Sequence, residues 1–152
     1  GDVKMSKNVW IGVGILAVVV VGFLFFSSST GNVVRAEMID GGDVMKIPLS
    51  GIGENAEFYD LQGTEFFVVR ASDGSVKSAF NACDVCYRAK KGYRQEGGDM
   101  ICNNCGNHYA IDGIGTKNLK GGGCWPGYLP STVEGDYLVI KKSDLAAGSY
   151  RF

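Results

Sequence analysis

An uninterrupted apolar segment near the N-terminus constrains this chain more than any other feature. Residues 9–26 read VWIGVGILAVVVVGFLFF, which is 18 residues without a charged side chain. As a helix this segment would be roughly 27 Å long, close to the hydrocarbon thickness of a bilayer. Trp10 lies at one end, where interfacial aromatic residues are enriched. We therefore predict one transmembrane helix, and a cleavable secretory signal is the main alternative because Lys4 and Lys7 precede the segment.

The charges that flank the apolar segment predict its orientation. Lys4 and Lys7 precede it, whereas Arg35 follows it among acidic residues such as Glu37. The positive-inside rule then predicts a single-pass protein of the cell membrane with a cytoplasmic N-terminus. Met5 is a candidate natural start. The expected order is a cytoplasmic N-terminus (1–8), a transmembrane helix (9–26), a Gly-punctuated linker (27–43) and an extracytoplasmic domain (44–152).

The charge balance and the residue types exclude several classes of function. The 152 residues include 15 Lys+Arg and 16 Asp+Glu, so the net charge is −1. A nucleic-acid binder normally carries a basic surplus, and we expect no nucleic-acid partner. A single histidine, with no visible Ser/His/Asp or paired-carboxylate arrangement, disfavours hydrolytic chemistry. An electron carrier or metal-binding protein is favoured over an enzyme, and a thiol oxidoreductase acting through Cys124 is a third option.

The chain after residue 43 has the short hydrophobic period of β-strands and no sustained period of 3.6 residues. Turn signals separate the candidate strands. The apolar run at residues 66–69 is typical of a strand that is covered on both faces. We predict a mainly β fold, a small antiparallel β domain. Its expected strands cover residues 44–49, 57–61, 65–71, 76–82 and 137–141.

A cysteine-rich part, residues 81–130, lacks hydrophobic periodicity and contains all five cysteines and the only histidine. Such a region usually needs a metal or disulfides to become ordered. The cysteines form two CxxC pairs, 15 residues apart, and a single residue: Cys83 and Cys86, Cys102 and Cys105, and Cys124. Two residues between cysteines let both sulfurs of one turn face a single ion, so the two pairs predict a four-cysteine metal site. Each pair follows a short candidate strand, which favours a metal ribbon inserted in the β domain.

Four cysteine ligands do not by themselves determine which metal is bound. Zinc, a single iron ion and an iron–sulfur cluster all take four cysteines, and copper is less favoured. A c-type haem is excluded because Tyr87 and Gly106, not histidine, follow the two pairs. After the four CxxC cysteines, Cys124 and His108 are the additional candidate ligands. Two disulfides with one spare cysteine are the alternative outside the cytoplasm.

Four basic residues lie between the two CxxC pairs: Arg88, Lys90, Lys91 and Arg94. Cations at this place would stabilise the negative charge of a tetrathiolate and lower the thiol pKa values. An ordinary solvated loop is an equally good interpretation of the same residues.

Several motifs of the cysteine-rich part resemble one family. The runs AFNACDVC (79–86), GYRQEG (92–97), CNNCG (102–106) and GGC (122–124) are similar to the FtrD-like membrane iron–sulfur domain family, and the likeness covers roughly residues 44–152. The resemblance implies a membrane-tethered metal-binding domain, associated with high-affinity iron transport or respiratory electron flow. The family's cysteine positions are Cys83, Cys86, Cys102, Cys105 and Cys124.

Two functions follow as predictions. The first is electron transfer or iron and metal handling through the four-cysteine site at the outer membrane face. The alternative is a structural zinc-ribbon module, or an accessory subunit of a larger membrane complex, in which zinc replaces a missing core. The expected partners are the lipid bilayer and other membrane proteins.

Overall fold

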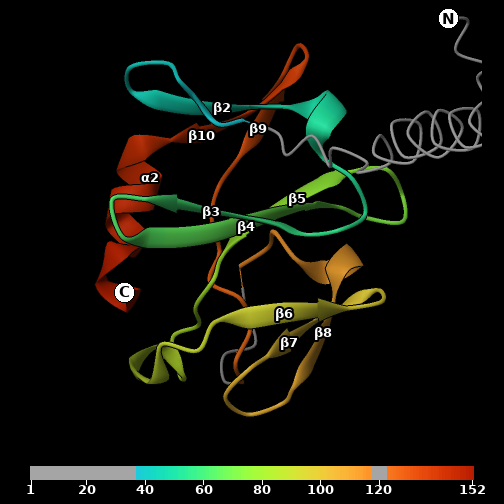
Figure 1. Ribbon diagram of the computed structural model, residues 1–152, viewed down its shortest axis with the longest axis vertical. Coiled ribbons are helices and arrows are strands. Elements are labelled where there is room, and N and C mark those ends of the chain that lie inside the picture. Colours follow the sequence, from blue (N-terminus) through green and yellow to red (C-terminus); the bar gives the residue numbers. More distant parts are fainter. Residues whose placement is uncertain (1–36, 118–122) are drawn as a thin grey trace, which may run out of the picture. The chain divides into compact units, whose positions relative to one another are not determined.

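The structure, a computed structural model, describes residues 37–117 and 123–152 (Figure 1). The predicted transmembrane helix, and the linker up to residue 36, lie outside the described residues. Among the residues that are described, no helix is long and apolar enough to cross a membrane.

Three small antiparallel sheets build the fold, which confirms the prediction of a mainly β chain (Figure 1). The first has the order β1-β2-β10-β9: Ile39–Asp40, Val44–Pro48, Tyr137–Lys141 and Thr132–Glu134. The second has the order β3-β4-β5: Glu57–Leu61, Thr64–Arg70 and Val76–Phe80. The third has the order β6-β7-β8: Tyr93–Glu96, Asp99–Cys102 and His108–Ala110. Helix α2 (Lys142–Gly148) follows β10, and the described residues also form 3-10 turns at Leu49–Gly51, Tyr87–Ala89, Ile111–Gly113 and Ser149–Arg151.

Strand β4 divides two hydrophobic cores. Phe66 and Val68 belong to the first core, which also contains buried side chains of β2, β10 and α2. Phe67 and Val69 belong to the second core, together with side chains of β6 and β7. Successive side chains of a strand point to opposite faces, so an uninterrupted apolar run suits a strand with cores on both sides. The prediction for residues 66–69 is confirmed.

The cysteine-rich part shares an apolar core with β4 and β5, which corrects the expectation that it lacks one. Tyr93, Met100 and Ile111 are buried there beside Cys102 and Cys124. Strands of three or four residues are too short to show a clear alternating pattern, so the sequence does not predict β6 and β8. The order of this region therefore does not depend on a metal alone.

Two further strands, β1 and the three-residue β9, and the helix α2 were not predicted. Strand β1 lies within the segment expected as a linker and pairs with β2. Helix α2 has seven residues, which is too few for a helical period to be visible in the sequence. It buries Leu145 against the first core.

Gly148 allows the end of α2 to approach Phe80, which is 2% exposed. A Cβ atom at Gly148 would overlap the Phe80 ring. We expect Gly148→Ala to lower the free energy of unfolding by about 1–3 kcal/mol, the usual cost of overpacking a core. Urea denaturation of the full chain in detergent measures this cost. Gly53→Ala is the matched control, because nothing lies within 4 Å of its Cβ position; equal stability of the two variants would contradict the close approach.

Candidate metal centre

Three separate segments carry the cysteines. Cys83 and Cys86 follow β5, and the second of them immediately precedes the 3-10 turn Tyr87–Ala89. Cys102 is the last residue of β7, and the turn after it contains Cys105. Backbone hydrogen bonds from Gly106 N to Cys102 O (2.8 Å) and from Cys102 N to Asn107 O (3.0 Å) close this turn. Cys124 lies in the extended segment before β9.

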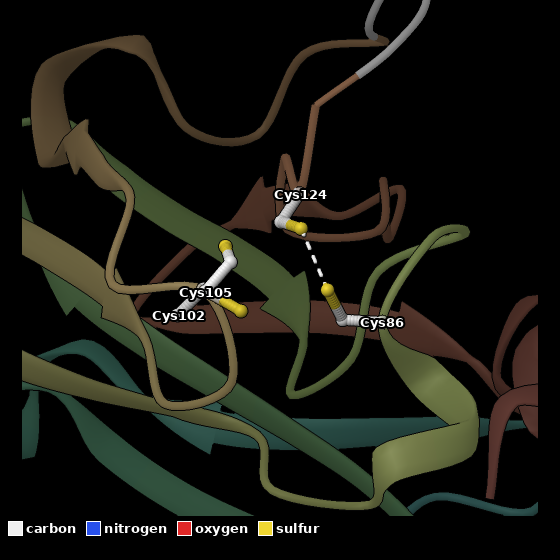
Figure 2. Close-up of side chains that lie close together, drawn as sticks. All are labelled: Cys86, Cys102, Cys105 and Cys124. Atoms are coloured by element: carbon white, nitrogen blue, oxygen red, sulfur yellow. Dashed lines mark hydrogen bonds between the residues drawn. The ribbon is translucent and has the colours of Figure 1, made fainter.

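The fold brings four thiol groups together (Figure 2). The Sγ atoms of this cysteine cluster all lie within 4.8 Å of one another, and its members are Cys86, Cys102, Cys105 and Cys124. The Sγ atoms of Cys86 and Cys124 are 2.8 Å apart and share a hydrogen bond. Convergence of four soft sulfur donors from three segments is the arrangement that a thiolate-bound metal requires.

The cluster differs by one member from the set of two CxxC pairs. Cys83 is not among the four, and Cys124 is. Cys83 is buried, and its Sγ accepts a hydrogen bond of 2.9 Å from the backbone N–H of Cys86. His108 also lies outside the cluster: its side chain is 58% exposed and its Nδ1 lies 3.1 Å from Asp99 Oδ2. All five cysteines are free of disulfides.

Backbone N–H groups of the two CxxC turns point at sulfur atoms. Besides the bond from Cys86 to Cys83, the backbone of Asn104 and Cys105 hydrogen-bonds to the Cys102 side chain, and the backbone of Asn107 to that of Cys105. Hydrogen bonds to sulfur favour the charged thiolate and tune the metal that it binds. The turns therefore orient the sulfurs and also stabilise their negative charge.

The four thiols of the cluster fall into two electrostatic classes. A hydrogen bond with Cys124, and a second with the Asn104 side chain, lower the pKa of Cys86 to about 7. The backbone of Asn107 lowers the pKa of Cys105, which is exposed. Burial raises the pKa of Cys102 and of Cys124. The two thiols nearer the surface thus ionise more readily than an ordinary cysteine thiol, and the two buried thiols ionise less readily.

Alkylation of the metal-free chain tests this division. We expect Cys86 and Cys105 to react first with iodoacetamide, because the thiolate is the nucleophile. The Cys86 rate should rise with pH through about 7, since a lowered pKa means loss of the proton near neutrality. Cys102 and Cys124 should react slowly until the chain is denatured. Isotope-coded reagents and peptide mass spectrometry measure the four rates, and faster reaction at Cys124 than at Cys86 would contradict the assignment.

Aromatic side chains hold the Cys124 segment in place. The Tyr93 hydroxyl donates a hydrogen bond to the carbonyl oxygen of Cys124, and burial raises the pKa of Tyr93, so this donor stays protonated. Tyr109 contacts Tyr93 and Trp125, with ring centroids 6.3 and 5.3 Å apart. Tyr93 belongs to the GYRQEG motif (92–97), but neither its role nor that of Tyr109 is predicted from the sequence, because their partners lie far along the chain.

A cleft of about 230 Å³ opens beside the cluster. Three cysteines line it, namely Cys83, Cys86 and Cys102. Lys90 and Lys91 line the same cleft, so two of the basic residues between the CxxC pairs border the cavity that these cysteines line. Both lysines are exposed.

The fold and the cysteine cluster define a small β domain in which four thiol groups converge. The chain belongs to the FtrD-like family, whose model is described as membrane iron–sulfur containing protein FtrD-like and matches residues 54–152. No curated protein matches the chain. The family is membrane-associated, and the four clustered thiols agree with a metal bound by cysteine.

The family description implies an iron–sulfur group. The cysteine cluster fits this group in its donor atoms but not in its sulfur spacing. Four thiolates with N–H···S hydrogen bonds are the donors that iron, zinc and iron–sulfur clusters share. The sulfur spacing is narrower than a polynuclear cluster requires. One tetrahedral ion with metal–sulfur bonds of about 2.3 Å places its sulfurs about 3.8 Å apart, and this suits four sulfurs within 4.8 Å.

Proposed function

We propose that this chain is a membrane-anchored extracytoplasmic metal protein. Cys86, Cys102, Cys105 and Cys124 hold the metal, and the centre serves electron transfer or the handling of iron or another metal. The observation that carries the proposal is the convergence of these four sulfurs within 4.8 Å of one another. The apolar residues 9–26 supply the anchor, and the positive-inside rule directs the domain away from the cytoplasm.

Exposure of the centre supports a functional metal over a structural one. Cys105 is exposed and Cys86 is half-buried, so part of the ligand set faces solvent. Electrons leave a redox centre, and metals exchange from a binding site, most readily where ligands reach the surface. The cleft lined by Cys83, Cys86 and Cys102 gives a second approach to the sulfurs.

The apolar cores support the same choice. The first core is built without any cysteine, and the second has Phe67, Met100 and Ile114, each fully buried. Structural zinc is most needed where a domain has no sufficient core, and this domain has two.

A structural zinc module remains the second candidate because of one observation. Cys102 and Cys124 are buried members of the second core, and they come from segments far apart in the sequence. An ion bound by both would link these segments and stabilise the fold, and the domain would then act as a subunit of a larger membrane complex.

The protein's own residues would have distinct roles in the favoured function. The four cysteines bind the metal, and Tyr93 orients Cys124 through the carbonyl oxygen of that residue. The apolar side chains of the second core exclude water from the buried sulfurs, which strengthens their interaction with a cation. Lys90 and Lys91 offset the negative charge that a tetrathiolate carries.

Elemental analysis of the full chain purified from its native membrane, with a visible absorption spectrum of the same sample, tests the proposal. Iron with thiolate absorption bands supports the redox interpretation, and potentiometry then gives its potential. One zinc ion per chain in a colourless sample supports the structural module instead, since zinc is d¹⁰. A metal-free chain with two disulfides would overturn both.

A further inference from the structure

We propose that the centre holds one metal ion and not an iron–sulfur cluster. The inference rests on the proposed function, because both require that Cys86, Cys102, Cys105 and Cys124 bind metal. It departs from the family description, which names an iron–sulfur protein.

The distances between sulfur atoms carry the inference. Two ligands of a single tetrahedral ion lie about 3.8 Å apart when each metal–sulfur bond is about 2.3 Å. In a [4Fe–4S] cluster each thiolate binds its own iron and points outward, so its sulfurs lie farther apart than those around one ion. The observed sulfurs all lie within 4.8 Å, and those of Cys86 and Cys124 are only 2.8 Å apart. One ion requires this closest pair to separate by roughly 1 Å; a cluster with its bridging sulfides requires much more.

Packing around the buried sulfurs resists such an expansion. Cys102 and Cys124 are 2% and 4% exposed and lie in one core with Ile111 and Ile114. Cys102 is also fixed by the register of the third sheet, in which it pairs with Tyr93, and the Tyr93 hydroxyl holds the carbonyl of Cys124. Protein interiors are close-packed, so moving these two residues apart would open voids or break the hydrogen bond. Only Cys86 and Cys105, nearer the surface, have room to adjust.

The fifth thiol and the cleft fit a single ion as well. Cys83 lies outside the group of four sulfurs that are within 4.8 Å of one another, and four thiolates are enough to coordinate one tetrahedral ion. The cleft reaches the sulfurs of Cys86 and Cys102, and a free ion from solution can enter by this route. A cluster requires sulfide and several iron ions to assemble in the same confined space.

Two measurements on the full chain test the inference. The first determines metal and acid-labile sulfide per chain in protein purified anaerobically from its native membrane. We expect one metal ion and no sulfide. The second titrates the reduced metal-free chain with Fe²⁺ or Zn²⁺ alone, without added sulfide, and we expect one equivalent to bind and to protect the four thiols from alkylation.

The outcomes separate the inference from the function on which it rests. Two or more irons per chain with a matching amount of sulfide would overturn the single-ion centre and leave the metal protein intact. A chain that is purified without metal and that binds neither ion in the titration would overturn both. One ion bound in the titration, with no sulfide in the native sample, supports both.

Discussion

Cys124→Ala is expected to weaken metal binding more than about 100-fold, because losing an outer-shell partner of a metal site already costs about 10–100-fold and a direct ligand contributes more. The Sγ of Cys124 lies in the cysteine cluster and contacts Cys86 at 2.8 Å. Its removal leaves three thiolates, of which Cys102 is buried, and the fourth coordination position open to water. Competition with a chromophoric chelator, on the full chain in detergent, measures the affinity of each variant for Zn²⁺.

Cys83→Ala is the matched control for this loss. Cys83 is as deeply buried as Cys102, at 2% exposure, but its Sγ lies outside the cluster. Its removal deletes the acceptor of the Cys86 N–H, and we expect affinity to fall by about 10-fold or less, the lower end of outer-shell effects. Equal losses in the two variants would show that all five cysteines share the ligand role. A larger loss in Cys83→Ala would restore the two-CxxC ligand set.

The strands that the sequence predicts are those long enough to show a pattern. Hydrophobic periodicity predicts five strands in the β domain, and two of them, β3 and β10, have the predicted bounds, Glu57–Leu61 and Tyr137–Lys141. The others differ by one or two residues at their ends. Strand β8, with three residues, has only one complete alternation, and no local signal distinguishes it from a loop.

The cysteine spacing predicts the region where the thiols converge better than it predicts which four of them do so. Two residues between cysteines determine that both sulfurs of a turn are near each other, which is local information. Whether Cys83 or Cys124 completes the set depends on where the segment before β9 crosses the first CxxC turn. That crossing is fixed by backbone hydrogen bonds of residues far apart in sequence, from Phe80 N to Gly127 O and from Gly127 N to Ala82 O, both 2.8 Å. The spacing of the cysteines along the sequence does not predict this crossing.

The two hydrophobic cores differ in their cysteine content. The first core joins β2, β10 and α2 to one face of β4. It contains no cysteine, so its packing does not involve the candidate metal ligands. The second core contains three cysteines and lies on the opposite face of the same strand. A substitution on β4 is therefore expected to disturb either the first core or the core that contains the cysteines, according to which face of the strand its side chain occupies.

Phe66 and Phe67, adjacent on β4 and both fully buried, test this expectation. We expect alanine at either position to lower the free energy of unfolding by about 3–5 kcal/mol, the usual cost of deleting a core phenylalanine. Urea denaturation of the metal-free full chain in detergent measures both. The variants should differ in metal binding, because Phe67 packs against Tyr93 (ring centroids 6.4 Å apart), whose hydroxyl holds Cys124. Phe66 instead stacks on Tyr59, at 5.4 Å, in the first core.

Leucine variants keep the comparison usable if the alanine variants do not fold. Phe67→Leu retains an apolar side chain but removes the ring that supports Tyr93, so its affinity for Zn²⁺ should fall about 10-fold or more, as for other outer-shell partners. Phe66→Leu should bind Zn²⁺ as the unaltered chain does, although it loses stability to a similar extent. If both variants lost affinity for Zn²⁺ in proportion to their loss of stability, metal binding would depend on the whole fold. The two faces of β4 would then not differ in their effect on metal binding. If only Phe67→Leu lost affinity, the link from β4 through Tyr93 to Cys124 would account for the difference, because the two substitutions are otherwise alike in size, burial and strand position.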